Sequence, residues 1–261
     1  MNHFKNKKKY YLIVILIIFI LFSYAINSGA NNKDLELSKS ISRVVLIELF
    51  VQTTCTTCPQ AEFCLEELTW EYGPEKIILL EEHLWGDGYD IPETNARYDW
   101  YVGEGAKGTP DVFINGLTNR IQGLACECGD IDENYLYYKK IIDSELARPS
   151  YLELSASKML DDSSIVIEGK VKNVSNITLK NLVVCGMVYK DCDELGLCYW
   201  VQDILPSKDI PELLPGDIYI YNTTSKPFPQ EESNEVPIHI VVFVQDVENP
   251  NKEILQALYV Q

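Results

Sequence analysis

The chain has 261 residues, of which 46% are hydrophobic and 23% charged, so it holds enough apolar material for packed cores and exceeds the usual ~100–200 residues of one domain. Its formal net charge is −17, and residues 1–30 carry lysines but no acid, so the rest of the chain is more acidic still. Such a chain repels nucleic acids and anionic lipid surfaces and attracts basic partners. We therefore exclude nucleic acid as a partner and attribute the acidity mainly to solubility.

We predict that residues 1–30 are an export signal, because a basic start precedes an almost wholly apolar run over residues 10–26. The small residues Ser28, Gly29 and Ala30 fit a cleavage site, whereas an apolar run of this length can also span a bilayer. We favour a retained membrane anchor over a cleaved signal, and both place the remainder outside the cytoplasm, membrane-anchored or secreted. Residues 31–42 then form a polar tether.

Residues 44–68 carry the most informative pattern of the chain. Residues 44–51 are apolar except for Glu48, which predicts a strand buried on both faces. After Pro59, apolar side chains recur at roughly helical spacing, at Phe63, Leu65, Leu68 and Trp70. Cys55 and Cys58 therefore lie where a strand ends and a helix begins.

This placement favours redox chemistry. The first turn of a helix offers unpaired N–H groups and the positive end of the helix dipole, which stabilise a thiolate relative to a thiol. A cysteine at that point is the expected nucleophile of the pair, and a second thiol one turn later can close a disulfide with it. Zinc ribbons use the same spacing but need a second cysteine pair in a similar context.

The chain downstream continues with strands and helices. A strand is expected over residues 76–80, then a long connection over 85–107 that is rich in Gly, Tyr and Trp and can hold a helix over 92–101. This insertion either caps the cysteine pair with an aromatic surface for peptides or packs on the sheet. Thr109 and Pro110 open a short apolar strand, and Asn115-Gly116 predicts a hairpin turn into residues 117–122. Residues 130–148 form an amphipathic helix.

The order strand, CxxCP, helix, strand, Thr-Pro, hairpin and helix resembles the thioredoxin superfamily over residues 40–148. The resemblance implies an α/β domain in which Cys55 is the nucleophile and Cys58 the resolving thiol. It also implies that Pro110 is a cis-proline packed beside the pair and that Thr109 offers its backbone to a substrate peptide.

The resemblance leaves the role of Glu48 open. In the family, a buried acid near this position assists proton transfer for the resolving cysteine, but Glu48 lies one residue farther from Cys55. The alternative is a carboxylate at an edge or bulge that reaches water. Thr56 and Thr57, between the cysteines, are expected at the substrate surface and add no positive charge to stabilise the thiolate.

From residue 151 the hydrophobic pattern changes to period two, with about seven short strands separated by turn residues. This count and spacing predict an antiparallel sandwich of immunoglobulin-like type, in which we find no catalytic constellation. The expected organisation is an α/β thioredoxin-like domain over residues 43–149, with an insertion at about 85–107, followed by an all-β immunoglobulin-like sandwich over 150–261.

The remaining cysteines need partners if the protein is exported into an oxidising compartment. Cys192 and Cys198 flank an expected hairpin tip and are the preferred structural disulfide, whereas Cys185 is interpreted as a buried free thiol.

Two interpretations of Cys126 and Cys128 stay open. They form either a second dithiol that exchanges electrons with the first pair, or a structural bridge from one of them to Cys64, which we favour because Cys64 would otherwise lack a partner.

The resulting hypothesis is an extracytoplasmic enzyme that exchanges thiols and disulfides of proteins or peptides through a mixed disulfide. The uncharged residues between its cysteines favour a reductant or isomerase over a strong oxidant, and such an enzyme needs an electron donor in the membrane. We expect no cofactor and no metal. The alternatives are a non-catalytic envelope scaffold and, less favoured, a zinc site built from residues 55, 58, 126 and 128, or copper delivery.

Overall fold

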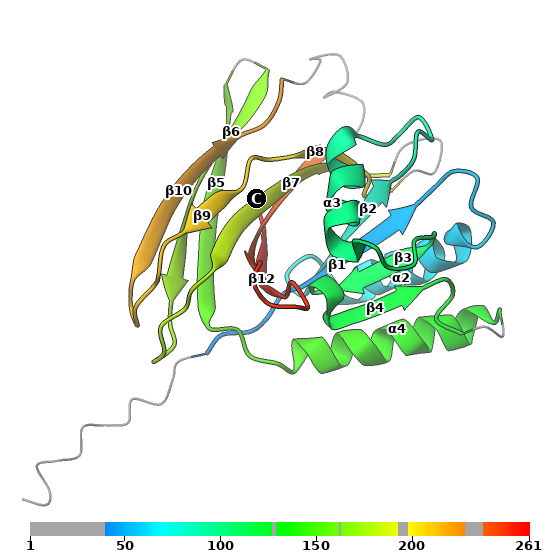
Figure 1. Ribbon diagram of the computed structural model, residues 1–261, viewed down its shortest axis with the longest axis horizontal. Coiled ribbons are helices and arrows are strands. Elements are labelled where there is room, and N and C mark those ends of the chain that lie inside the picture. The colour runs from blue at the N-terminus through cyan, green and yellow to red at the C-terminus, as the bar shows by residue number, and fades with distance from the viewer. Residues whose placement is uncertain (1–39, 127–128, 162, 193–197, 228–236) are drawn as a thin grey trace, which may run out of the picture. The chain divides into compact units, whose positions relative to one another are not determined.

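Three β-sheets and three α-helices make up the part of the chain that the computed structural model describes, residues 40–126, 129–161, 163–192, 198–227 and 237–261 (Figure 1). These described residues form a single compact unit. No helix among the described residues is long and apolar enough to cross a membrane, and residues 1–30, where we predicted an anchor or signal, lie outside them.

A mixed sheet of order β2-β1-β3-β4 holds the N-terminal half of the described chain. Its strands are β1 (Val45–Val51), β2 (Ile77–His83), β3 (Asp111–Ile114) and β4 (Asn119–Gln122). Strand β1 runs parallel to β2 and antiparallel to β3, and every residue of β1 is buried. Alternate side chains of β1 therefore enter two different cores.

The two faces of this sheet are covered by different elements. Val45, Ile47 and Leu49 pack in one core with the helices α2 (Cys58–Tyr72) and α4 (Ile131–Leu146). On the opposite face, Phe50 packs with Tyr98 and Tyr101 of α3 (Pro92–Val102), while Leu46 joins a core shared with a second sheet. The helix of the insertion thus packs on the sheet, the second of the two arrangements considered from the sequence.

A five-stranded sheet lies at the centre of the molecule. It contains β7 (Leu182–Lys190), β8 (Val201–Ile204), β9 (Lys208–Ile210), β11 (Ile238–Asp246) and β12 (Ile254–Tyr259) in the order β12-β11-β7-β8, with β9 also paired to β7. Met187 and Phe243 face the mixed sheet, whereas Val184 and Val242 face the other way. The central strands β7 and β11 are consequently buried on both faces.

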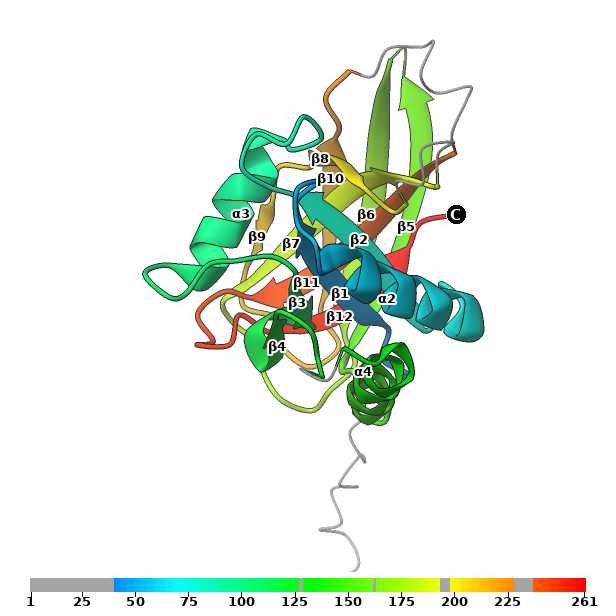
Figure 2. The same cartoon turned by 90° about the vertical axis from the view of Figure 1, so that its right-hand side faces the viewer.

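The third sheet, of order β10-β6-β5, covers the remaining face of the five-stranded sheet. It consists of β5 (Leu152–Asp161), β6 (Ser164–Asn173) and β10 (Ile218–Thr224). A 3₁₀ turn, η1 (Gly116–Thr118), joins β3 to β4. The layers therefore run from three-stranded sheet to five-stranded sheet, mixed sheet and helices α2 and α4 (Figures 1 and 2).

The predicted fold class, an α/β thioredoxin-like domain followed by an immunoglobulin-like sandwich, is wrong. Of the residues that the structure describes, 41% lie in strands and 22% in helices, and the strands form three sheets. The prediction gave each half a core of its own, but Leu46 and Leu80 of the mixed sheet share a core with Val241 and Phe243 of the five-stranded sheet. Because apolar side chains cover both faces of β7 and β11, these strands join the two halves. The boundary near residue 150 stays a prediction.

A buried ionic group lies where α3, the mixed sheet and the five-stranded sheet meet. Arg97 of α3 forms an ion pair with Glu48 of β1, and the Tyr101 hydroxyl donates to the second Glu48 oxygen at 2.6 Å. Gln245 of β11 donates through its side-chain amide to the Tyr101 oxygen at 2.8 Å. These bonds satisfy a charge pair that would otherwise be costly to bury.

Glu82 of β2 lies beside this group and is fully buried. No hydrogen-bond donor reaches either of its carboxylate oxygens among the described residues. Burial, together with the Glu48 carboxylate, raises the pKa of Glu82 well above its ordinary value, although Arg97 opposes the shift. Folding therefore favours the uptake of a proton by Glu82, so its contribution to stability falls as the pH rises above the ordinary pKa of glutamate.

We expect Glu82→Gln to raise the free energy of unfolding at pH 7 by on the order of 1 kcal/mol, because the amide needs no proton uptake. At pH 4, where the unfolded carboxyl is already largely protonated, the gain should nearly vanish. Urea denaturation at both pH values measures this difference, with the exposed Glu104→Gln as the control. An equal gain at both pH values would contradict the explanation.

Candidate functional site

Cys55 and Cys58 are joined by a disulfide at the start of α2, with their Cα atoms 5.5 Å apart. The two sulfur-bearing residues differ in access: Cys58 is 1% exposed, whereas Cys55 is only partly buried. Thr56 and Thr57 between them are exposed. A molecule approaching from solvent therefore meets Cys55 first, as expected for an attacking thiol with a protected partner.

The helix start supplies the electrostatics at Cys55. The backbone N–H of Cys58 donates a hydrogen bond to the Cys55 sulfur at 3.0 Å, and the Thr57 hydroxyl lies 3.8 Å from the same sulfur. No acidic side chain occurs in the first turn of α2 to oppose the positive end of the helix dipole. Groups of this kind stabilise a thiolate relative to a thiol.

The Thr109–Pro110 segment reaches the same end of the sheet as the disulfide. Its peptide bond is cis, Pro110 is buried, and Thr109 is partly exposed. The pairing of Phe50 with Asp111 places Pro110 across from the end of β1, from which the chain enters the cysteine loop. Thr109 and Pro110 are far from Cys55 in sequence, but the register of the sheet brings them toward it.

Three residues that the sequence interpretation missed as site residues anchor this segment. The buried Tyr98 of α3 accepts a hydrogen bond from the Gly108 N–H at 3.0 Å, and its hydroxyl lies 2.8 Å from the Asp111 carboxylate. Arg120 of β4 forms an ion pair with Asp111 at 2.6 Å. In the sequence, only the concentration of aromatic residues in the insertion pointed to Tyr98. The Asp111–Arg120 ion pair depends on the register of the β3–β4 hairpin, which no local pattern indicates.

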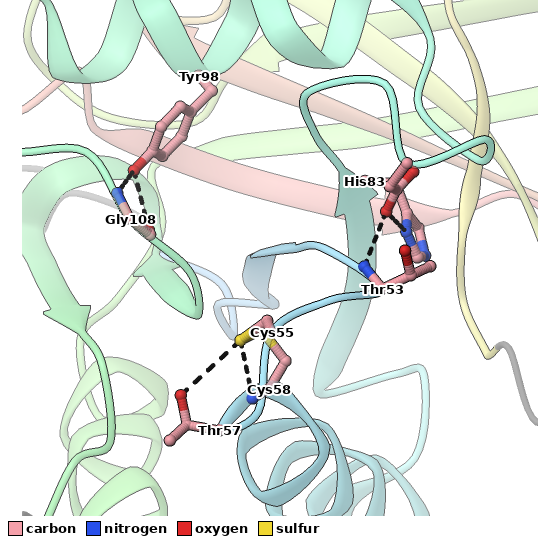
Figure 3. Close-up of a disulfide and its surroundings, with 8 residues drawn as sticks. Thr53, Cys55, Thr57, Cys58, His83, Tyr98 and Gly108 are labelled. Atoms are coloured by element: carbon pink, nitrogen blue, oxygen red, sulfur yellow. Dashed lines mark hydrogen bonds and ion pairs between the residues drawn. A yellow bond between two sulfur atoms is a disulfide. The ribbon is translucent and has the colours of Figure 1, made fainter.

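The opposite side of the disulfide is formed by the end of β2. His83 Nδ1 lies 2.7 Å from an Asp87 carboxylate oxygen, and the same oxygen accepts a hydrogen bond from the Thr53 N–H at 3.1 Å. Figure 3 shows Gly108 and Tyr98 on one side of the disulfide and Thr53 and His83 on the other. The loop that precedes Cys55 is therefore tied to β2 through Asp87.

A group of partly buried carboxyls lies between α2 and β2. Glu62 follows Cys58 by four residues, the spacing at which helical side chains are neighbours. Burial, with a further contribution from the Glu66 charge, raises the pKa of Glu62 to about 7. Burial and the charges of Glu62 and Glu66 raise the pKa of the buried Glu81 well above its ordinary value. No local sequence pattern marks these carboxyls, because their burial depends on the packing of α2 on the mixed sheet.

Glu48 is not brought to the disulfide. Its carboxylate lies on the face of β1 opposite the core that contains Cys58, and it is held by Arg97 and Tyr101. The alternation of side chains along a strand explains this, because a position one residue farther from Cys55 points to the other face. Nor does Glu48 reach water, since it is fully buried.

The remaining cysteines fall into three environments. Cys64 is a buried free thiol on α2, so the favoured bridge from it to the 126–128 loop does not form. Cys126 is disulfide-bonded, and Cys128 lies outside the described residues. Cys185 is a buried free thiol, and Cys192 and Cys198 form a disulfide.

No group of three or more His, Cys, Asp or Glu side chains within the described ranges is arranged to hold a metal ion.

No family model and no curated protein matches the chain. Among solved structures, HBP35 of Porphyromonas gingivalis is similar, with a TM-score of 0.61 and 18% identity over 84% of this chain and 75% of that chain. A domain of the outer membrane lipoprotein Omp28 from Porphyromonas gingivalis has a TM-score of 0.30 at 19% identity, covering 43% of this chain and 88% of that one. A β-glucuronidase of Bacteroides uniformis also has a TM-score of 0.30, at 16% identity, over 41% of this chain and 12% of that one.

The HBP35 likeness concerns the fold alone. Because it covers 84% of the chain, it spans both of the predicted halves rather than a separate N-terminal domain. The predicted resemblance to the thioredoxin superfamily, with a trailing immunoglobulin-like domain, is therefore wrong. The part of the chain that matches HBP35 is a single β-rich structure. The other two similarities are too low to support an argument.

We expect Tyr98→Phe to lower the free energy of unfolding by about 1–3 kcal/mol, because it leaves the buried Asp111 carboxylate with one partner fewer. Urea denaturation at pH 7 measures the loss. Tyr137→Phe is the matched control, since Tyr137 is 48% exposed on α4 and should change stability little. Equal effects of the two substitutions would show that the Tyr98 hydroxyl does not anchor the segment.

Proposed function

We propose that the protein is an extracytoplasmic thiol–disulfide oxidoreductase that acts on protein or peptide disulfides, as a reductant or isomerase. The observation that supports this most directly is the Cys55–Cys58 disulfide at a helix start, with one accessible and one protected residue. The N-terminal export pattern and the second disulfide between Cys192 and Cys198 agree with an oxidising compartment.

The reaction proceeds by two exchanges. In the reduced enzyme, the Cys55 thiolate attacks one sulfur of a substrate disulfide; that S–S bond breaks, and the departing substrate thiolate takes up a proton. Cys58 then loses its proton and attacks the Cys55 sulfur of the mixed disulfide, releasing the second substrate thiol. Two electrons pass to the substrate, and the Cys55–Cys58 disulfide must be reduced again by a thiol or membrane electron donor.

The surroundings of the disulfide suit an extended peptide. Thr56 and Thr57 are exposed beside Cys55, and Thr109 is partly exposed at the same end of the sheet. A substrate strand placed along Thr109 can form main-chain hydrogen bonds while its sulfur faces Cys55. The excess of acidic residues in the chain favours neutral or basic peptides.

Glu62 is the proposed proton acceptor for Cys58. It lies one helical turn beyond Cys58, and a pKa of about 7 lets it exchange a proton near neutral pH. This assignment replaces Glu48, whose carboxylate is held on the other face of β1.

We expect Cys55→Ser to lower insulin disulfide reduction at least about a hundredfold, because the attacking thiolate is removed. Cys58→Ser should accumulate a mixed disulfide through Cys55, detected by mass spectrometry after acid quenching. Cys64→Ser removes another thiol of α2 and should retain most of the activity. Full activity of the Cys55 variant, or no trapped adduct in the Cys58 variant, would contradict the proposal and favour a non-catalytic scaffold.

We expect Glu62→Gln to slow release of the mixed disulfide roughly tenfold or more at pH 8, because Cys58 loses its nearby proton acceptor. The pH profile of this step in the unmodified enzyme should contain an inflection near 7 that the variant lacks. Stopped-flow measurement of product release gives the rates. The exposed Glu67→Gln is the control on the same helix, and identical profiles for all three proteins would reject the role of Glu62.

A further inference from the structure

A cavity of about 580 Å³ lies at the opposite end of α2 from the disulfide. It is open to solvent and is lined by the end of α2, the start of β2 and the adjoining ends of β7, β11 and β12. Thr69 follows Cys58 by eleven residues along the helix, which corresponds to about 16 Å at 1.5 Å per residue. The cavity is therefore distinct from the cysteine site.

Apolar and aromatic side chains form most of the cavity wall. Ile77 and Leu79 of β2 line it together with Tyr189, Tyr199 and Tyr259. Trp70 stands at the opening and is 77% exposed, the largest exposed fraction among the large hydrophobic side chains of the described residues. The volume falls within the ~300–1,000 Å³ of small-molecule sites, which are mostly apolar with a few fixed polar groups.

The polar groups of the cavity are held in place by one another. His239 Nδ1 lies 2.6 Å from the Tyr259 hydroxyl, and His239 Nε2 lies 3.4 Å from an Asp191 carboxylate oxygen. Elsewhere in the lining, the Thr69 and Tyr199 hydroxyls are 3.1 Å apart. A ligand thus meets a preformed arrangement and loses little affinity to side-chain ordering.

The charge of the cavity selects among ligands. Among the described residues, Asp191 is the one carboxylate that lines the cavity, and no described lysine or arginine lines it. The chain as a whole is also strongly acidic, and a net negative charge disfavours the approach of anions. Tyrosine and tryptophan faces attract cations within about 6 Å, which adds to the effect of Asp191.

The Cys192–Cys198 disulfide stabilises two sides of this cavity. Cys192 follows Asp191, and Cys198 precedes Tyr199; Asp191, Cys192 and Tyr199 all line the cavity. The covalent link therefore holds the segments that carry Asp191 and Tyr199 next to one another. The Cys192–Cys198 disulfide thus has a local role that does not depend on the redox activity proposed for Cys55 and Cys58.

We propose that this cavity binds a flat aromatic cation, with its rings against Trp70 and the tyrosines and its positive edge toward Asp191. The occupant is a small molecule, which is separate from the protein or peptide substrate proposed for the cysteine site. Neither Trp70 nor Asp191 belongs to that site, so binding and disulfide reduction can be tested independently.

The test uses proflavine, a planar aromatic cation, with fluorescence polarisation on the full exported chain. Trp70→Ala and Asp191→Asn should each weaken binding about fivefold or more, because one removes the stacking surface and the other the charge. Phe63→Ala is the control for Trp70, since Phe63 is 50% exposed on the same helix but does not line the cavity. Glu104→Gln, which removes one exposed negative charge elsewhere, is the control for Asp191.

Several outcomes would overturn the proposal. They are the absence of saturable proflavine binding, equal losses in the variants and their controls, and tighter binding of the anionic dye 1-anilinonaphthalene-8-sulfonate. A dimer in sedimentation velocity that Trp70→Ala abolishes would also overturn it, by assigning the opening to a second copy of the chain. Unchanged insulin reduction by both cavity variants separates this result from the proposed oxidoreductase function.

Discussion

Burial of β7 and β11 on both faces is the constraint on which the architecture depends. Val184 and Val242 on one side, and Met187 and Phe243 on the other, are withdrawn from water by two different sheets. Each fully buried side chain of this kind contributes about 1.5–3 kcal/mol relative to an exposed one. The five-stranded sheet can satisfy both faces only if the mixed sheet packs on it, so the N-terminal and C-terminal halves form one body.

The contact between the mixed sheet and the five-stranded sheet contains buried polar residues. Arg97 forms an ion pair with Glu48, lies 5.2 Å from the Phe243 ring and donates a hydrogen bond to Gln245 at 3.3 Å. The arrangement joins an element of the insertion to β1 and β11. A buried pair of this kind is costly to break, because the partner left behind is an uncompensated charge. The carboxylate first considered for catalysis is therefore assigned to structure.

Helix α2 connects the two regions to which we assign chemistry. Its first turn presents N–H groups to the Cys55 sulfur, and its last turn contributes Thr69 and Trp70 to the aromatic cavity. The first region depends on the helix dipole and the sheet register that aligns Thr109 with the end of β1. The second depends on the contact between the mixed sheet and the five-stranded sheet. Both are consequences of how α2 and β2 are positioned.

Local patterns in the sequence determined several elements. The apolar run before the cysteines and the helical spacing after Pro59 coincide with β1 and α2, because both are fixed by side-chain periodicity and by the turn residues between them. The position of Cys55 at a helix start follows from the same pattern. The sequences of β7 and β11 are apolar without alternation, a pattern typical of strands buried on both faces. A strand of a two-layer sandwich is instead buried on one face, so this pattern already argued against the predicted sandwich.

Tertiary structure alone decided the rest. The layer order, the placement of Glu48 away from Cys58, the free state of Cys64 and the cavity between β2 and β7 all depend on contacts between residues distant in sequence. Periodicity tells which side chains leave water but not which surface covers them. The sequence by itself thus determined the Cys55–Cys58 pair and the helix that follows it, whereas only packing between sheets determined which carboxyls, aromatics and thiols became the neighbours of that pair.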